Sequence, residues 1–178
     1  MKNCNLRSKI LHLASCILLF ISGCGYHFIG SGSGLPEHIK KVVIPLTVNR
    51  TAEPGLEDIL AKALIEEFMK DGRLKVVSTE EADTILHSVV VSFQTAPLSF
   101  DNRGFVTAYK IVMKVDFKLE DIRDKKIIWE EKEMENSLKS DYKPSDDLII
   151  TKTLKDEAIR KTCRNISQDV ISRIHEAF

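Results

Sequence analysis

The segment 109–119 alternates apolar and polar side chains almost without a break. The apolar set is Tyr109, Ile111, Met113, Val115, Phe117 and Leu119. The polar set is Lys110, Lys114, Asp116 and Lys118, interrupted by Val112. Successive side chains of a β-strand point to opposite faces, so this pattern predicts a strand with one buried face and one face in water. Such a strand requires a sheet that is covered on one side only.

Two segments with helical periodicity can provide that cover. Residues 56–70 repeat apolar side chains at helical spacing, and Gly72 stands where a C-terminal cap belongs. The second helix is expected to begin near Ser145, a suitable N-cap. Its apolar stripe consists of Ile159, Cys163, Ile166, Val170, Ile174 and Phe178. We expect both helices to pack on the same face of the sheet.

Three more strands are expected on either side of segment 109–119. They cover residues 40–48, 82–97 and about 127–137, and residues 74–77 can add a short extended piece. Pro45 removes one hydrogen-bond donor from the first strand, which indicates an edge or a bulge. The order strand, helix, strand, strand, strand, helix predicts an α+β domain over residues 38–178 with a four-stranded, mostly antiparallel sheet. A right-handed crossover would place the first strand parallel to a neighbour.

The N-terminus has the features of a bacterial lipoprotein signal. A cationic start is followed by the apolar stretch 10–20 and by Ile21-Ser22-Gly23-Cys24. We predict that residues 1–23 are removed, that Cys24 carries the covalent lipid, and that the Gly- and Ser-rich segment 24–37 is a flexible spacer. Gly25 replaces the Asp of the usual inner-membrane retention signal, so we expect a lipid-anchored outer-membrane protein facing the periplasm. A plain secretory signal or a membrane stub stays open as an alternative.

Charge and cysteine content argue against a nucleic-acid-binding protein and against a disulfide-stabilised fold. Three of the 26 basic residues and none of the 26 acidic residues precede Cys24, so the mature chain has a formal charge of −3. This balance disfavours a globally basic nucleic-acid-binding protein. After removal of Cys4 and Cys16 and acylation of Cys24, only Cys163 remains, and no disulfide can form within one chain.

The chain shows no pattern that indicates an enzyme. The histidines have no metal-ligand spacing, and His87 is expected to be a packed or edge residue of a strand. Cys163 lies on an apolar helical stripe and is predicted to be a buried, inert thiol. The acids at 130, 131, 133 and 135 are interpreted as a solvated face. We therefore expect no catalytic residue, no metal and no cofactor beyond the lipid. Substitutions of Cys163 or Glu131 should be silent, whereas in a lipoprotein hydrolase they would abolish turnover.

Basic side chains form the remaining candidate site. Arg103 lies in the predicted turn 101–104, and the polar side of the next strand carries Lys110 and Lys114. Arginine offers phosphate a planar fork of donors and lysine a mobile point charge, so these residues can hold an anionic head group. The alternative is an ordinary wet strand face, balanced by Asp116 and Glu120.

Several segments resemble the LptE family of lipopolysaccharide-assembly lipoproteins. They are the CGYHF start at Cys24, IKKVVIPLTVNRT, EPGLEDILAKALIEEF and GFVTAYKIVMKV. The resemblance implies a four-stranded sheet with two helices, a plug within the outer-membrane barrel LptD, and a part in delivering lipopolysaccharide to the cell surface. It also implies that Arg103 contacts lipopolysaccharide. Lys143 and Lys152 are candidates for a second basic contact by location.

A second resemblance stays open. The IKKVVIPL strand and the DGRLKVVSTEEADTIL run are similar to periplasmic lipoproteins that activate penicillin-binding proteins or form part of secretion complexes. Those proteins are also lipidated α+β modules. The long alternating strand over residues 109–119 and the sequence TAYKIVMKV favour the LptE family.

Overall fold

The computed structural model describes residues 35–136 and 140–178. The strands are β1 (Lys41–Val43), β2 (Val48–Asn49), β3 (Lys75–Val76), β4 (Thr84–Phe100), β5 (Val106–Asp121), β6 (Lys126–Glu135) and β7 (Ser140–Tyr142). The helices are α2 (Leu56–Asp71) and α3 (Leu148–Ala177), with the short 3₁₀ turn η1 (Thr79–Glu81). The predicted signal peptide and Cys24 lie outside the described residues.

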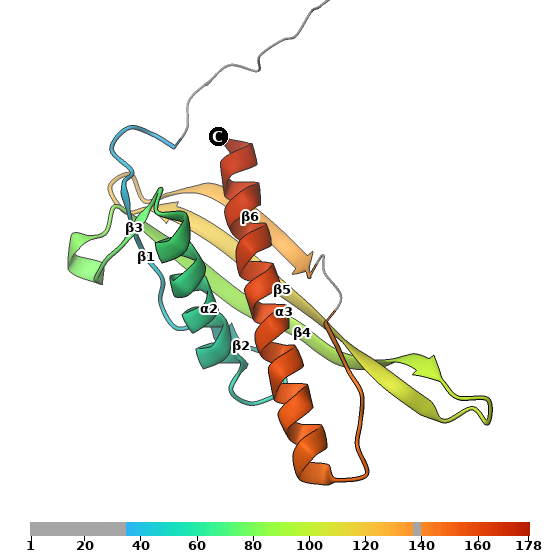
Figure 1. Ribbon diagram of the computed structural model, residues 1–178. Helices are drawn as coiled ribbons and strands as arrows, with labels where there is room; N and C mark the ends of the chain where they lie inside the picture. Colours follow the sequence, from blue (N-terminus) through green and yellow to red (C-terminus); the bar gives the residue numbers. More distant parts are fainter. Residues whose placement is uncertain (1–34, 137–139) are drawn as a thin grey trace, which may run out of the picture. The chain divides into compact units, whose positions relative to one another are not determined.

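All the described strands join one mixed sheet. The order is β3-β1-β4-β5-β6, while β2 pairs with β4 and β7 pairs with β5. β1 runs parallel to β3 and β4, and the strands from β4 to β6 form an antiparallel meander. Figure 1 shows α2 and α3 side by side across one face of this sheet. The α+β class and the parallel first strand are confirmed.

The prediction of four strands is wrong, because the described residues alone form seven. The expected strand 40–48 is divided at Pro45 into β1 and β2, since proline lacks the N–H that a continuous ladder requires. β3 and β7 are two and three residues long. The short extended piece expected at residues 74–77 is confirmed as β3. β7 was not expected, because a strand of three residues shows no clear alternation in the sequence.

The core lies between the helix pair and the covered face of the meander. β5 contributes six buried apolar side chains, those of Ala108, Ile111, Met113, Val115, Phe117 and Leu119. α2 contributes Leu56, Leu60, Leu64 and Phe68, and α3 contributes Ile159, Cys163, Ile166, Val170 and Ile174. The apolar face of the alternating strand and both apolar stripes are therefore buried as the sequence predicts, except that Tyr109 and Phe178 at their ends are half-buried.

The N-cap of α3 lies two residues later than expected. Asp147 caps the helix, because its Oδ1 accepts hydrogen bonds from the backbone N–H groups of Ile149 (2.7 Å) and Ile150 (3.3 Å). Ser145 instead lies in the preceding turn, where its carbonyl oxygen accepts a hydrogen bond from the Thr151 hydroxyl. The expectation of a Ser145 cap was wrong because two capping residues stand close together and the second one forms the bond.

Two elements extend beyond the core at the same end of the domain. The outer part of the β4–β5 hairpin projects as an arm, and residues 94–100 of β4 contain no buried side chain. The first buried residue of α3 is Ala158, and residues 148–150 of its first turn are all exposed, so the start of the helix lies beyond the core. Figure 1 shows the arm and the start of α3 pointing away from the C-terminus. No helix among the described residues combines the length and apolar character that a bilayer crossing requires.

Candidate functional site

The tip of the arm is a tight turn held by Asp101. The backbone N–H of Gly104 donates to the Asp101 carbonyl at 3.0 Å, and Gly104 has a φ of 87°, in the left-handed region that favours glycine. Asp101 Oδ1 accepts from the N–H groups of Phe105 (2.9 Å) and Arg103 (2.8 Å). These bonds, that from Phe105 above all, lower the pKa of the Asp101 carboxyl. The tip is therefore a defined structure that fixes where Arg103 emerges.

Arg103 is held at its base and open at its end. Its Nε donates to Asp101 Oδ2 at 3.3 Å, and its guanidinium carbon lies 5.5 Å from the centroid of the Phe105 ring. The side chain is 80% exposed. Among the described residues, Asp101 is the one hydrogen-bond acceptor for this guanidinium, which has five N–H donors. The remaining donors face solvent and can bind an oxyanion.

The structure separates Arg103 from the two candidate lysines of β5. Lys114 lies eight residues beyond the start of the strand, about 26 Å along it, so one phosphate cannot bridge both side chains. Lys114 Nζ also donates to Glu133 Oε2 at 2.9 Å, and this hydrogen bond raises the pKa of the Lys114 amine. Lys110 is opposite Asp141 of β7, and no ion pair with another described residue engages it.

The two candidates for a second basic contact lie in different segments, Lys143 just after β7 and Lys152 in α3. Lys143 lines a hollow of about 360 Å³ between β7 and α3, which also contains Lys161, Asp141 and Glu157. Two acids balance two bases there. Lys152 is exposed near the start of α3, at the same end of the domain as the arm. Lys143 follows Tyr142, which pairs with Tyr109 close to the outer end of β5. Both assignments stay predictions.

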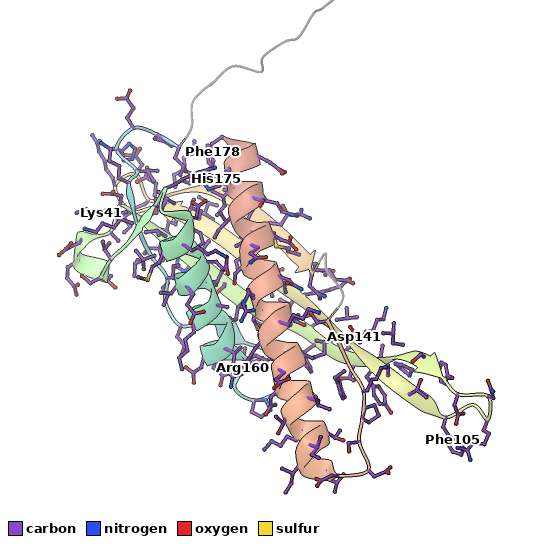
Figure 2. The ribbon with its side chains drawn as sticks, in the orientation of Figure 1. Lys41, Phe105, Asp141, Arg160, His175 and Phe178 are labelled. Carbon is purple, nitrogen blue, oxygen red and sulfur yellow. The ribbon has the colours of Figure 1, made fainter. Side chains whose placement is uncertain are left out.

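Sequence reasoning missed the apolar character of this end. Phe100 and Phe105 flank the turn and are 60% and 66% exposed, and Figure 2 shows Phe105 at the end of the arm. At the start of α3, Leu148 and Ile149 are 84% and 77% exposed. Neighbouring exposed apolar side chains mark an interaction surface, and here they occur on two projections, the tip of the arm and the first turn of α3. We call these residues, together with Leu98 and Ile150, the apolar end.

A histidine–carboxylate pair closes the opposite side of the domain. His38 Nε2 lies 2.8 Å from Asp121 Oδ2, and Asp124 brings a third ligand-type atom within 4.8 Å. Asp121 Oδ1 accepts from the backbone N–H groups of Arg123 and Asp124. Both Asp121 oxygens are thus engaged, and the group works as a clamp between the start of the domain and the β5–β6 turn. The 83 residues between His38 and Asp121 explain why spacing did not reveal the pair.

Burial and hydrogen bonding act in opposite directions on Asp121. Burial alone would raise the pKa of its carboxyl, but the hydrogen bonds from His38 and from the Asp124 and Arg123 N–H groups outweigh it. The pKa therefore lies below the ordinary value of 3.8. The folded state favours the carboxylate form.

The residues considered as candidates for catalysis are either buried or paired with a neighbouring side chain. Cys163 is buried, and burial raises the pKa of its thiol to about 12, so no thiolate forms at neutral pH. Glu131 is paired with Arg173 of α3, and His87 lies 3.0 Å from Glu120 on the neighbouring strand. Cys163 is thus the buried, inert thiol that the sequence predicts.

Comparison with known proteins gives the family. The sequence matches the family model LptE, described as lipopolysaccharide-assembly, over residues 39–174. The chain belongs to the LptE family. This is a family of non-catalytic assembly lipoproteins, and membership associates the chain with the machinery of lipopolysaccharide assembly. Membership of this lipoprotein family is consistent with a location in the outer membrane. The search of curated protein sequences returned no match.

Solved structures share the fold of this LptE-family chain. Rare lipoprotein B from Shewanella oneidensis has a TM-score of 0.50 at 14% identity, with 76% of this chain and 93% of that chain covered. An uncharacterized lipoprotein B from Nitrosomonas europaea has a TM-score of 0.51 at 18% identity, with 77% and 83% covered. A minor lipoprotein from Acinetobacter baumannii has a TM-score of 0.50 at 16% identity, with 79% and 94% covered. At these identities the likeness concerns the fold alone.

Proposed function

We propose that this chain is acylated on Cys24, plugs and stabilises the LptD barrel in the outer membrane, and assists the transport and assembly of lipopolysaccharide. The motif ending at Cys24 supports the anchor, since two or more acyl chains hold a protein durably at a membrane. Membership of the LptE family supports the pathway. The protein works by binding and turns nothing over.

The apolar end is the observation that carries the proposal. Burying an exposed Leu, Ile or Phe side chain fully contributes about 1.5–3 kcal/mol, and the arm and the first turn of α3 each present several such side chains. They stand on a capped helix and a hydrogen-bonded turn, so little ordering entropy opposes their docking. We therefore assign the apolar end to contact with the barrel.

Recovery of the barrel with the tagged lipoprotein tests this assignment. In mild detergent the parent protein should bring down LptD, and the double variant Phe100→Ser with Phe105→Ser should bring down much less. Met69→Ser is the matched control, because Met69 is 67% exposed but lies near the end of α2. Equal recovery with the double variant would remove the apolar end from the interface.

We also propose that Arg103 contacts the phosphates of lipopolysaccharide. Its open guanidinium donors and its place at the end of the arm support this role. Lys110 is a weaker candidate and Lys114 weaker still, because Glu133 already pairs with Lys114. Arg103→Glu should weaken glycolipid binding by about tenfold, the usual range for a lost charge-assisted hydrogen bond, without lowering the melting temperature. Arg123→Glu, in the exposed β5–β6 turn, should have no effect, and unchanged affinity of Arg103→Glu would refute the assignment.

A further inference from the structure

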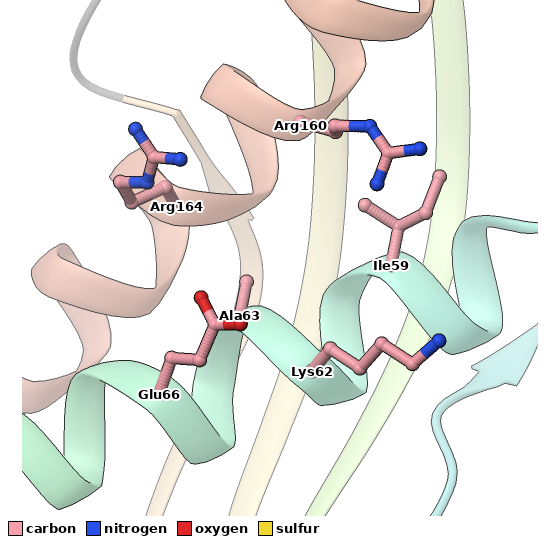
Figure 3. A pocket seen from close by; sticks show the side chains of 6 residues that line it. All are labelled: Ile59, Lys62, Ala63, Glu66, Arg160 and Arg164. Atoms are coloured by element: carbon pink, nitrogen blue, oxygen red, sulfur yellow. The ribbon is translucent and has the colours of Figure 1, made fainter.

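The outer surface of the helix pair has a hollow that the proposed function does not use. It has a volume of about 190 Å³ and lies between α2 and α3. Its lining residues are Ile59, Lys62, Ala63, Glu66, Arg160 and Arg164. Figure 3 shows that α3 contributes the two arginines and α2 the other four residues. The small side chain of Ala63 leaves room between the helices at this level.

Cations predominate in this hollow. Lys62, Arg160 and Arg164 face a single acid, Glu66, which gives a local formal charge of +2. Within the part of the chain that the structure describes, none of these cations forms an ion pair. Other cations of the same helix do: Lys155 binds Glu53 with its Nζ 2.7 Å from Oε1, and Arg173 pairs with Glu131. The three cations around the hollow are thus left with hydrogen-bonding capacity for a ligand.

Helix geometry explains why the charges converge. Arg160 and Arg164 are four residues apart, so they lie on the same face of α3 and both line the hollow. Lys62 and Glu66 are also four apart, but with the lysine N-terminal to the acid, which is the less favourable order for an ion pair. Ile59 and Ala63, both half-buried, form the apolar part of the lining. The four charged residues are exposed, so an anion in solution can reach them.

We infer that this hollow binds a phosphate group. A phosphomonoester carries a charge of about −1.5 to −2 at neutral pH and three strong acceptor oxygens, which matches the local charge of the hollow. Two guanidinium forks and one ammonium can engage all three oxygens. A carboxylate brings one charge and two oxygens, so it would leave one cation unmatched. The site lies on the helix pair and is independent of Arg103 and of the apolar end.

Titration of the mature lipoprotein in mild detergent with inorganic phosphate tests the inference, with ³¹P relaxation as the readout. We expect saturable binding that Arg160→Gln and Arg164→Gln each weaken by about fivefold or more. Arg123→Gln, an exposed arginine of the β5–β6 turn, should leave the affinity unchanged. Glu66→Gln should strengthen binding, because it removes the one opposing charge. This gain cannot arise from a loss of folding.

Competing anions and a lipid separate the sources of the phosphate. Sulfate, a dianion, should displace phosphate, and acetate at the same concentration should not. Micelles of a short-chain phosphatidic acid that bind more tightly than phosphate, in an Arg160-dependent way, would identify a lipid head group, whereas equal affinity would identify free phosphate. No saturable binding, full displacement by acetate, or equal affinity in both arginine variants and the parent would overturn the inference.

Discussion

Helix α3 is divided into a packed part and a projecting part, and one chemical change applied to each part tests that division. Ile166 is fully buried in the core between the helices and the sheet, with 0% exposure. Ile149, in the first turn of α3, is 77% exposed. We consider Ile166→Ala and Ile149→Ala. Both remove the same three carbons from the same helix and differ only in surroundings.

The two expected losses of stability differ severalfold. For Ile166→Ala, lost transfer free energy of about 0.8 kcal/mol for each carbon group gives about 2.4 kcal/mol. The cavity left behind adds to this, and measured changes of this kind fall at about 2–5 kcal/mol. A loss of about 3 kcal/mol corresponds to a fall in melting temperature of about 6–12 °C for a domain of this size. For Ile149→Ala we expect a change within about 0.5 kcal/mol, as for other surface sites.

Urea unfolding followed by far-ultraviolet circular dichroism provides the measurement, with equal m-values confirming that the same surface unfolds in each protein. The helical signal at 0 M urea should be unchanged in both variants. Similar losses for the two variants, or a larger loss for Ile149→Ala, would show that the start of α3 packs against the core and would refute the division.

Three further predictions concern the core, the clamp and the anchor. Met113→Asp should abolish cooperative unfolding, because it places an unpaired charge at a fully buried position of β5, and a melt like that of the parent would contradict this. Asp121→Asn should lower the free energy of unfolding at pH 7 by about 1–3 kcal/mol. A carboxyl whose pKa is lowered in the folded state stabilises the fold above its unfolded pKa and loses that effect as the pH falls. The difference in unfolding free energy between variant and parent should therefore narrow below about pH 4. A difference that stays constant with pH would contradict the clamp. Cys24→Ala should leave the precursor uncut in the inner membrane, and correctly processed protein would end the lipoprotein assignment.

The sequence predicts the parts of this fold that repeat a pattern over many residues. The alternation in β5 and the apolar stripes of α2 and α3 locate these elements to within a few residues, because burial of one face imposes a period on the sequence. A short extended piece at β3 is also expected from the sequence, but β7 is not, because a strand of two or three residues completes at most one alternation. Their places are set by partners distant in sequence, such as Lys41 for Lys75 and Ile111 for Ser140.

The candidate site is predicted only in part for a related reason. The turn residues at 101–104 indicate a hairpin tip, so the exposure of Arg103 follows from the sequence. The exposure of Phe100 and Leu148 does not, because the same apolar residues would be core residues if the sheet or the helix ended later. Which residues project depends on where the covering layer stops, and this is a property of the assembled domain. The phosphate hollow likewise depends on the packing of α2 beside α3.

Site-specific photocrosslinking in intact outer membranes tests most directly whether the apolar end contacts the barrel. A photoreactive amino acid at position 105 or 149 should give an adduct with LptD, and the same group at the buried position 166 should give none. Adduct formation at 105 and 149 is the result we predict. Its absence from both positions, in a protein that is processed and located in the outer membrane, would contradict the account.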